Sequence, residues 1–185
     1  MRPIALSLLL GLTMLDGVAS AQEPAASGGK IAGTAIVVLT REFCTAEANT
    51  GNRTSGFEVF RLGRLLCPSA EQAVRNAFER VIRMETVPKP EDAGGHLILI
   101  PRFTDVEATH TIVKNRKMAL LLDWSATEPG GRVLWVQTVE GTAVGKNGAH
   151  QSLAEAVAQD LVANSTEAMK KSQEIRHFIE DRLGK

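Results

Sequence analysis

The sequence predicts an α+β domain, a two-layer sandwich in which a mainly antiparallel sheet of about four to five strands carries two helices on one face. Large apolar residues alternate with small or polar ones on both sides of a Pro-Gly-Gly segment in 118–142, which is typical of a long β-hairpin. Two segments with apolar residues at helical spacing begin near Pro68 and Ser152. Helices of this kind bury their apolar stripe by covering one face of such a sheet.

The turn of the hairpin is predicted at Glu128-Pro129-Gly130-Gly131. Proline presets its own φ, and glycine reaches positive φ without steric cost. With the midpoint between Pro129 and Gly130, Trp124 faces Trp135 across the strands, and we predict that the two indoles are neighbours. We interpret this pair as ordinary sheet packing. An aromatic platform for a ligand is the alternative.

Three further strands are expected. Ile31 to Thr40 is rich in β-branched residues, and its continuous apolar run predicts burial on both faces. Phe57 to Leu62 alternates more weakly. His96 to Phe103 is a strand in which Pro101 implies an edge position or a bulge. The last of these leads into the hairpin, so the final three strands are expected to form an antiparallel meander.

The first helix is expected to open at Pro68, with Ser69 and Gln72 as a capping box, and to continue until Pro88. Its core face comprises Ala70, Ala73, Val74, Ala77, Phe78, Val81 and Ile82. The arginines on its other face are interpreted as solvated, with a partner surface as the alternative.

The last helix is expected to open at Ser152, with Glu155 completing a second capping box. Small and polar residues in the middle of its apolar stripe permit a break near Asn164. The stripe ends in an apolar cluster. We interpret this cluster as docking on the domain, and the alternative is a candidate surface for a partner protein. The members of this cluster are Ile175, Phe178, Ile179 and Leu183.

The first residues predict export. A short positive start precedes an apolar run at Ile4–Leu15 that is too short to span a membrane, and Ala19-Ser20-Ala21 matches a signal-peptidase site. We expect cleavage between Ala21 and Gln22, so residues 1–21 are a signal peptide, 22–30 a flexible lead-in and 31–185 a single domain. The expected location is periplasmic or secreted. No later segment is apolar enough to cross a bilayer.

Charge and cysteine content narrow the function classes. The 21 basic and 21 acidic residues balance, so no general attraction to nucleic acid is expected. In an exported chain, an even pair of cysteines is most simply one disulfide, here Cys44–Cys67. A reactive thiol at Cys67, near a helix start, is the competing interpretation.

No catalytic, cofactor-binding or metal-binding residue is assigned. None of the four histidines has the spacing of a helical metal site, although His96 and His110 could approach each other across the strand and its return. Asp105 and Glu107 could pair as carboxylates, but a solvated strand edge that discourages aggregation explains them more simply.

The element order resembles that of small bacterial envelope proteins. Examples are the LPS-assembly lipoprotein of the outer membrane, the auxiliary lipoproteins of ABC-type lipid transporters, and the N-terminal domain of TolB. The resemblance rests on the strand Ile31–Thr40, the helix beginning Pro68-Ser69-Ala70, the strands LILI and MALLLDW, and the helix beginning Ser152-Leu153-Ala154. The chain departs from the lipoproteins in having no cysteine just after the cleavage site.

The resemblance implies a periplasmic accessory or interaction protein of the cell envelope, without catalytic activity or cofactor, whose partner is another envelope protein. Peripheral membrane association stays open. The alternatives are a binding module for a small apolar ligand and a hydrolase with a scattered site. A closed apolar cavity would favour the ligand-binding module, and convergent polar groups with perturbed pKa values would favour the hydrolase. A filled core with an exposed apolar patch would favour the accessory role.

Overall fold

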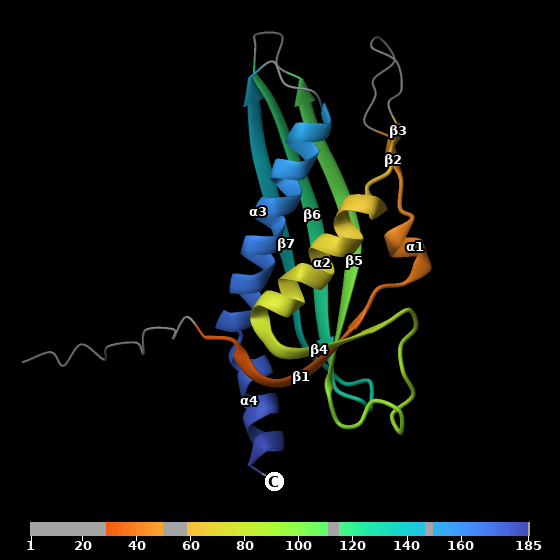
Figure 1. The fold of residues 1–185 in the computed structure, drawn as a ribbon, viewed down its shortest axis with the longest axis vertical. Helices are drawn as coiled ribbons and strands as arrows, with labels where there is room; N and C mark the ends of the chain where they lie inside the picture. Colours follow the sequence, from red (N-terminus) through yellow and green to blue (C-terminus); the bar gives the residue numbers. More distant parts are fainter. Residues whose placement is uncertain (1–28, 50–58, 111–114, 147–149, 185) are drawn as a thin grey trace, which may run out of the picture.

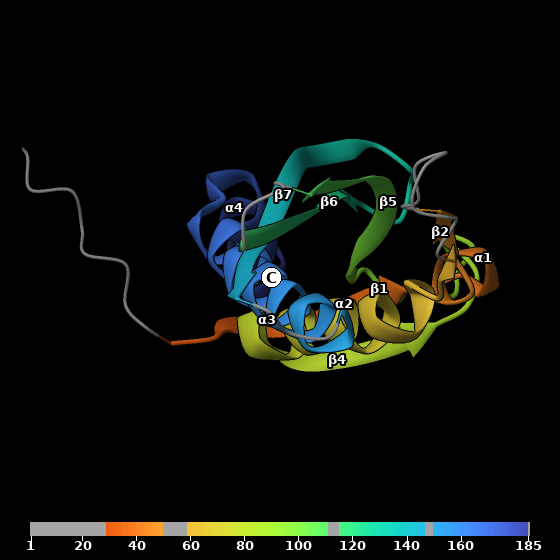
Figure 2. The same cartoon turned by 90° about the horizontal axis from the view of Figure 1, so that it is seen from above.

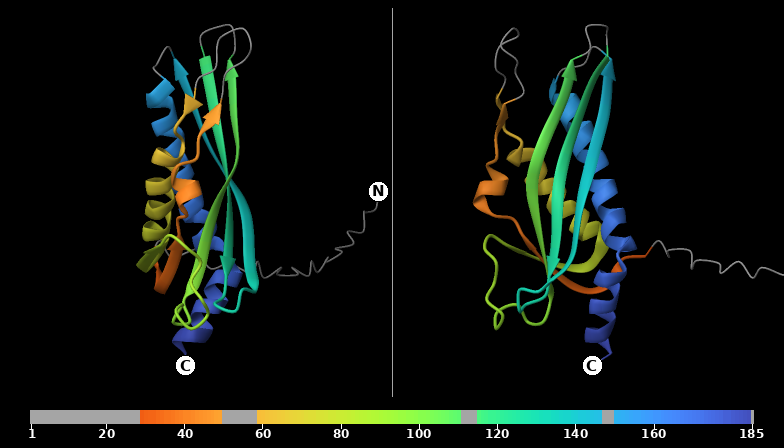
Figure 3. Two further views of the ribbon diagram at one scale, coloured as in Figure 1. Left: turned by 90° about the vertical axis from the view of Figure 1, so that its right-hand side faces the viewer. Right: turned by 180° about the vertical axis from the view of Figure 1, so that it is seen from behind.

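The computed structural model describes residues 29–49, 59–110, 115–146 and 150–184. Within them the chain forms a five-stranded mixed sheet in the order β4-β1-β5-β6-β7, and a separate two-stranded sheet of β2 and β3. The predicted α+β class is confirmed: helices α2 and α3 cover one face of the large sheet (Figures 1 and 3). In chain order the elements are β1 (Ile31–Val38), α1 (Arg41–Cys44), β2 (Ala48–Asn49), β3 (Val59–Phe60), α2 (Gly63–Ala77), β4 (Phe78–Met84), β5 (Leu97–His110), β6 (Asn115–Thr127), β7 (Val133–Lys146), α3 (His150–Lys171) and α4 (Gln173–Leu183).

Strand β1 lies inside the sheet and runs parallel to both of its neighbours, β4 and β5. Ala35 and Val37 belong to the main core beneath the helices, whereas Ile36 and Val38 pack in a second, small core under the β4–β5 connection. Burial on both faces, as the apolar run predicts, is therefore confirmed. The sheet curls so that β1 and β4 lie across from β6 and β7 (Figure 2).

Helix α2 starts and ends earlier than predicted. It begins at Gly63, so Pro68 lies inside it. Ser69 is not its N-cap, because the Ser69 hydroxyl donates a hydrogen bond to the carbonyl of Leu65 at 2.7 Å. The helix ends at Ala77, well before Pro88. The predicted capping box and helix end are both wrong.

Residues Phe78–Met84 form strand β4 rather than the last turns of the helix. The spacing of the apolar residues in this segment fits a helical face: Phe78, Val81 and Ile82. The segment instead pairs in parallel with β1, so that β1, α2 and β4 form a β-α-β unit, and this long-range pairing overrides the local periodicity. Phe78 stays fully buried, but Ile82 is 39% exposed.

The predicted second strand does not join the large sheet. Of Phe57 to Leu62, the structure keeps Val59–Phe60 as β3, which pairs only with β2, and Leu62 is the N-cap of α2. Residues 57 and 58 lie outside the described part, as do the predicted signal peptide and the predicted cleavage site.

A disulfide joins α1 to α2 in the structure, which agrees with the pairing expected from the sequence. The Sγ atoms of Cys44 and Cys67 lie 2.06 Å apart. Gly63 permits the close approach of the two helices, because a Cβ at this position would collide with the backbone carbonyl of Cys44.

Strands β5, β6 and β7 form the predicted antiparallel meander. The polar segment after Phe103 extends β5 as far as His110. Pro101 lies in the middle of this strand and is buried. Because β1 pairs with β5 only at Leu97–Leu99, residue 101 has no strand neighbour on that side, and its missing N–H breaks no ladder.

The turn between β6 and β7 is one residue longer than predicted. Glu128 and Arg132 close a three-residue loop in which Gly131 has a φ of 85°. Leu134 and Trp135 then form a bulge, and both pack against the main core. The loop and the bulge together shift the register by two positions.

The two tryptophans consequently do not face each other directly. Trp124 lies opposite Gln137, and Trp135 lies opposite Ala126, so the indoles occupy diagonal positions on the core face of the sheet. The register predicted from a turn midpoint between Pro129 and Gly130 is wrong.

The last helical segment consists of two helices, and the break lies at Ser172 rather than near Asn164. Ser172 caps α4 by accepting a hydrogen bond from the backbone N–H of Ile175 at 3.2 Å. Helix α3 begins at His150, two positions before the predicted start at Ser152.

Candidate functional site

The predicted partner cluster at the end of the chain is largely part of the core. Ile175, Phe178 and Ile179 are buried against the main core, as the docking alternative expects, and Leu183 alone is exposed, at 58%. Burial of these three side chains leaves Leu183 as the member of the cluster that is largely exposed to solvent.

The described residues contain no group of three or more His, Cys, Asp or Glu side chains that could hold a metal ion. His96 and His110 cannot approach each other, because they lie at opposite ends of β5. The side chains of His110 and Glu107 lie outside the described part. In that part of the chain, no helix is long and apolar enough to span a membrane.

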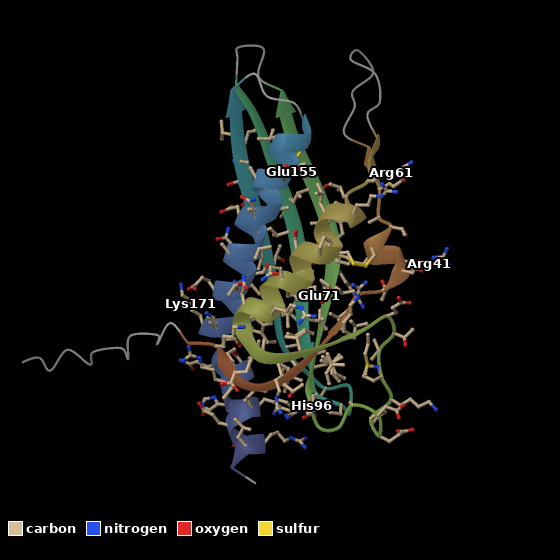
Figure 4. All side chains as sticks on the ribbon, in the orientation of Figure 1. Arg41, Arg61, Glu71, His96, Glu155 and Lys171 are labelled. Atoms are coloured by element: carbon tan, nitrogen blue, oxygen red, sulfur yellow. A yellow bond between two sulfur atoms is a disulfide. The ribbon has the colours of Figure 1, made fainter. Side chains whose placement is uncertain are left out.

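A cleft of about 320 Å³ opens beside α4. In Figure 1, α4 lies at the lower end of the sheet. The cleft lies between the beginning of β1, strand β4, the segment that precedes β5, and α4. His96 marks this place in Figure 4. The lining residues are Gly33, Thr34, Arg80, Gly94, Gly95, His96, Phe178, Ile179, Arg182 and Leu183.

A β-bulge shapes the inner wall of this cleft. One extra residue of β1 lies between the pairs Ile31–Phe78 and Thr34–Arg80, next to Gly33, whose φ is 110°. The bulge sets Thr34 opposite Arg80 in the ladder. The positive φ favours glycine at residue 33, and a Cβ there would lie 3.4 Å from the side chain of Ile179 on α4.

Arg182 projects from α4 across the ring of Phe178, with the guanidinium carbon 5.3 Å from the ring centre. Gly95 faces the same guanidinium, and a Cβ there would lie 3.3 Å from Nη1. The cation–π contact places the charged group at the cleft, and glycine at residue 95 leaves room for it.

The charge of Arg182 affects the pKa of the Glu128 carboxyl group. A hydrogen bond from Arg132 is the main cause that lowers the pKa of Glu128, and the charges of Arg132 and Arg182 lower it further. The Glu128 carboxylate is already paired with Arg132, at 2.8 Å. It therefore neutralises Arg182 only in part.

A second, smaller cavity of about 180 Å³ lies on the other side of α4. Ile179 and Leu183 line both cavities, so the end of α4 forms a ridge between them. Lys30, Lys170 and Arg176 supply positive charge on this side, and Glu180 supplies negative charge.

The face of the meander that points away from the helices is the other candidate site. No described helix covers it (Figure 3, right). Along β7, Val133, Val136 and Val144 are 56%, 64% and 65% exposed. They lie on the face opposite to Val139, which is buried in the core.

The sequence does not predict the residues of the cleft. The predicted helix would place Arg80 among the arginines of its solvated face, whereas Arg80 belongs to strand β4. The pair Gly94-Gly95 by itself indicates only a turn. Consecutive glycines before a histidine were the one local signal of a special backbone, since both glycines have positive φ.

Comparison with solved structures shows the fold. A Xanthomonas campestris protein of family DUF330, XCC0632, superposes with a TM-score of 0.55 at 12% identity, over 88% of this chain and 93% of that one. A minor lipoprotein from Acinetobacter baumannii gives a TM-score of 0.42 at 10% identity, over 74% and 91%. PelC from Paraburkholderia phytofirmans gives 0.43 at 11%, over 78% and 89%. No family model and no curated protein matches the sequence. This chain is thus similar in fold to the DUF330 protein.

Proposed function

We propose that the protein is an exported accessory protein of the bacterial cell envelope, which acts by binding another envelope protein. The predicted signal peptide supports export. The observation that carries the binding role is the uncovered face of the meander, where Val133, Val136 and Val144 stand exposed on one strand. Val133 and Val136 lie near one end of β7 and Val144 near the other, with Thr138, Glu140 and Thr142 between them on the same face. An uncovered sheet face that carries exposed apolar side chains is a candidate protein-binding surface.

The rest of the domain agrees with this role. The main core is formed by side chains of the sheet and the helices, and the exposed valines of the outer face are not part of it. In the described residues, the groups with shifted pKa values are Glu128, Arg132 and Glu174. The first two form a surface ion pair and the third belongs to a helix cap, so neither arrangement resembles a catalytic site.

The partner should present an apolar strip to β7. A photoreactive amino acid placed at Val136 or Val144 in living cells should crosslink the protein to one envelope protein. The same substitution at Arg41, an exposed residue of α1, is the control and should not.

The captured protein is then purified and its affinity measured. V136E/V144E should weaken binding by about tenfold or more, because two buried carboxylates in the interface would lack partners. The double variant should unfold at the temperature of the parent, since both side chains are exposed. Equal crosslinking from Arg41, or equal affinity of the double variant, would contradict the proposed surface.

A further inference from the structure

The cleft beside α4 brings together polar side chains from three elements that are far apart in sequence. Arg80 of β4 and Arg182 of α4 supply positive charge, and His96, which precedes β5, supplies an imidazole ring. Among the described residues, neither arginine has a carboxylate within 4.0 Å, although Glu180 and Asp181 flank Arg182 in the chain. The guanidinium donors of both side chains are therefore available to a ligand.

Part of the lining of this cleft is apolar. Phe178 and Ile179 are buried in the main core and present their edges to the cleft, while Leu183 is exposed beside them. Thr34 is buried and forms no side-chain hydrogen bond within the described part of the chain, so its hydroxyl adds a polar group to the wall. The lining of the cleft thus combines two guanidinium groups with apolar side chains.

We infer that this cleft binds a small organic anion with an apolar body. A carboxylate or phosphate accepts hydrogen bonds from Arg80 and Arg182, whose planar donors suit both groups. The apolar body lies on Phe178, Ile179 and Leu183. A volume of 320 Å³ holds roughly ten water-sized groups at about 30 Å³ each, which corresponds to an anion with a medium-length alkyl chain.

The inference is independent of the proposed partner surface, which lies on the outer face of the meander. A protein that binds no partner through β7 could still bind the anion, and the reverse also holds. The two proposals therefore fail separately.

The test is isothermal titration of the purified protein with octanoate and octyl phosphate, below the concentrations at which they form micelles. Inorganic phosphate, octanol and octyltrimethylammonium are the comparison compounds. Octanoate or octyl phosphate should bind, and each comparison compound should bind about tenfold more weakly or not at all, because each lacks one of the two required parts. Preference between the two anions identifies the head group.

R80Q and R182Q test the assignment of the cations. Each should weaken binding of the preferred anion by about tenfold, since each removes charge-assisted donors from the ligand. R41Q, which alters an exposed arginine on α1, should leave it unchanged. All three side chains are exposed, so the fold is retained, and circular dichroism checks this.

Three results would overturn the inference. The first is that neither octanoate nor octyl phosphate binds. The second is that octanol or inorganic phosphate binds as tightly as the alkyl anion, which would show that binding does not require both the charge and the apolar body. The third is that R80Q and R182Q bind the anion with the affinity of the parent.

Discussion

Trp124 links the two layers of the domain through a single polar contact. Its side chain is fully buried, and its Nε1–H donates a hydrogen bond of 3.0 Å to the hydroxyl of Ser165 on α3. Ser165 is itself buried. Since neither group reaches water, each depends on the other for its hydrogen bond. Alternation along the strand predicts that Trp124 is buried, but the partner lies 41 positions away in sequence and is not predictable from spacing.

Ser165→Ala should lower the free energy of unfolding by about 1–3 kcal/mol, because it leaves the buried indole N–H without an acceptor. In a Trp124→Phe background the same change should cost clearly less, since no N–H is left unpaired. Urea unfolding of the parent, the two single variants and the double variant measures this coupling. Equal costs in both backgrounds would show that the hydrogen bond contributes nothing.

At the scale of elements, the structure depends on contacts between segments that local periodicity does not reveal. Helix α3 lies against the free edge of β7, where the Asp160 carboxylate accepts from the N–H of Thr142 at 2.8 Å and the Asn164 amide donates to the carbonyl of Glu140 at 2.9 Å. These side chains satisfy backbone groups that an edge strand would otherwise leave open. The polar residues in the middle of the helix, which suggested a break, therefore have a structural role.

Gly141 sets how closely α3 approaches β7. A Cβ at this position would lie 2.6 Å from the carbonyl oxygen of Val157 and 2.8 Å from the N–H nitrogen of Leu161. Gly141→Ala should thus destabilise the domain by about 1–3 kcal/mol through overpacking. Gly130→Ala is the matched control, because a Cβ there meets nothing within 4 Å. Thermal unfolding compares the two, and equal stability would mean that the helix is free to move away from the strand.

The junction of α2 and β4 can be tested with two residues that the sequence places on one helical face. Phe78→Ala should cost about 3–5 kcal/mol, since the ring is fully buried. Ile82→Ala should cost much less, because strand β4 leaves this side chain 39% exposed. Denaturant unfolding distinguishes the cases. A comparable loss in both variants would favour a continuous helix through residue 82.

For the whole molecule, one covalent bond joins the segment after β1 to the first covering helix. The disulfide Cys44–Cys67 closes a separation of 23 residues. Because it restricts the unfolded chain, the double variant C44S/C67S should lose about 3 kcal/mol of stability in the chain-entropy model. Dithiothreitol should lower the melting temperature of the parent to that of the double variant and leave the variant unchanged. A parent insensitive to reductant would contradict this contribution.

The sequence by itself determined the layers of this protein. Three patterns predict which side chains are buried: the alternation along residues 118–142, the continuous apolar run of β1, and the apolar stripe that ends near Ile175. Burial is predictable in these segments because it depends mainly on composition and on the spacing of apolar residues. Only the tertiary structure decided where α2 ends, the register of the hairpin, and the cleft at Arg80 and Arg182. Each of these depends on pairing or packing between segments far apart in the chain, and such contacts leave no regular pattern in either segment alone.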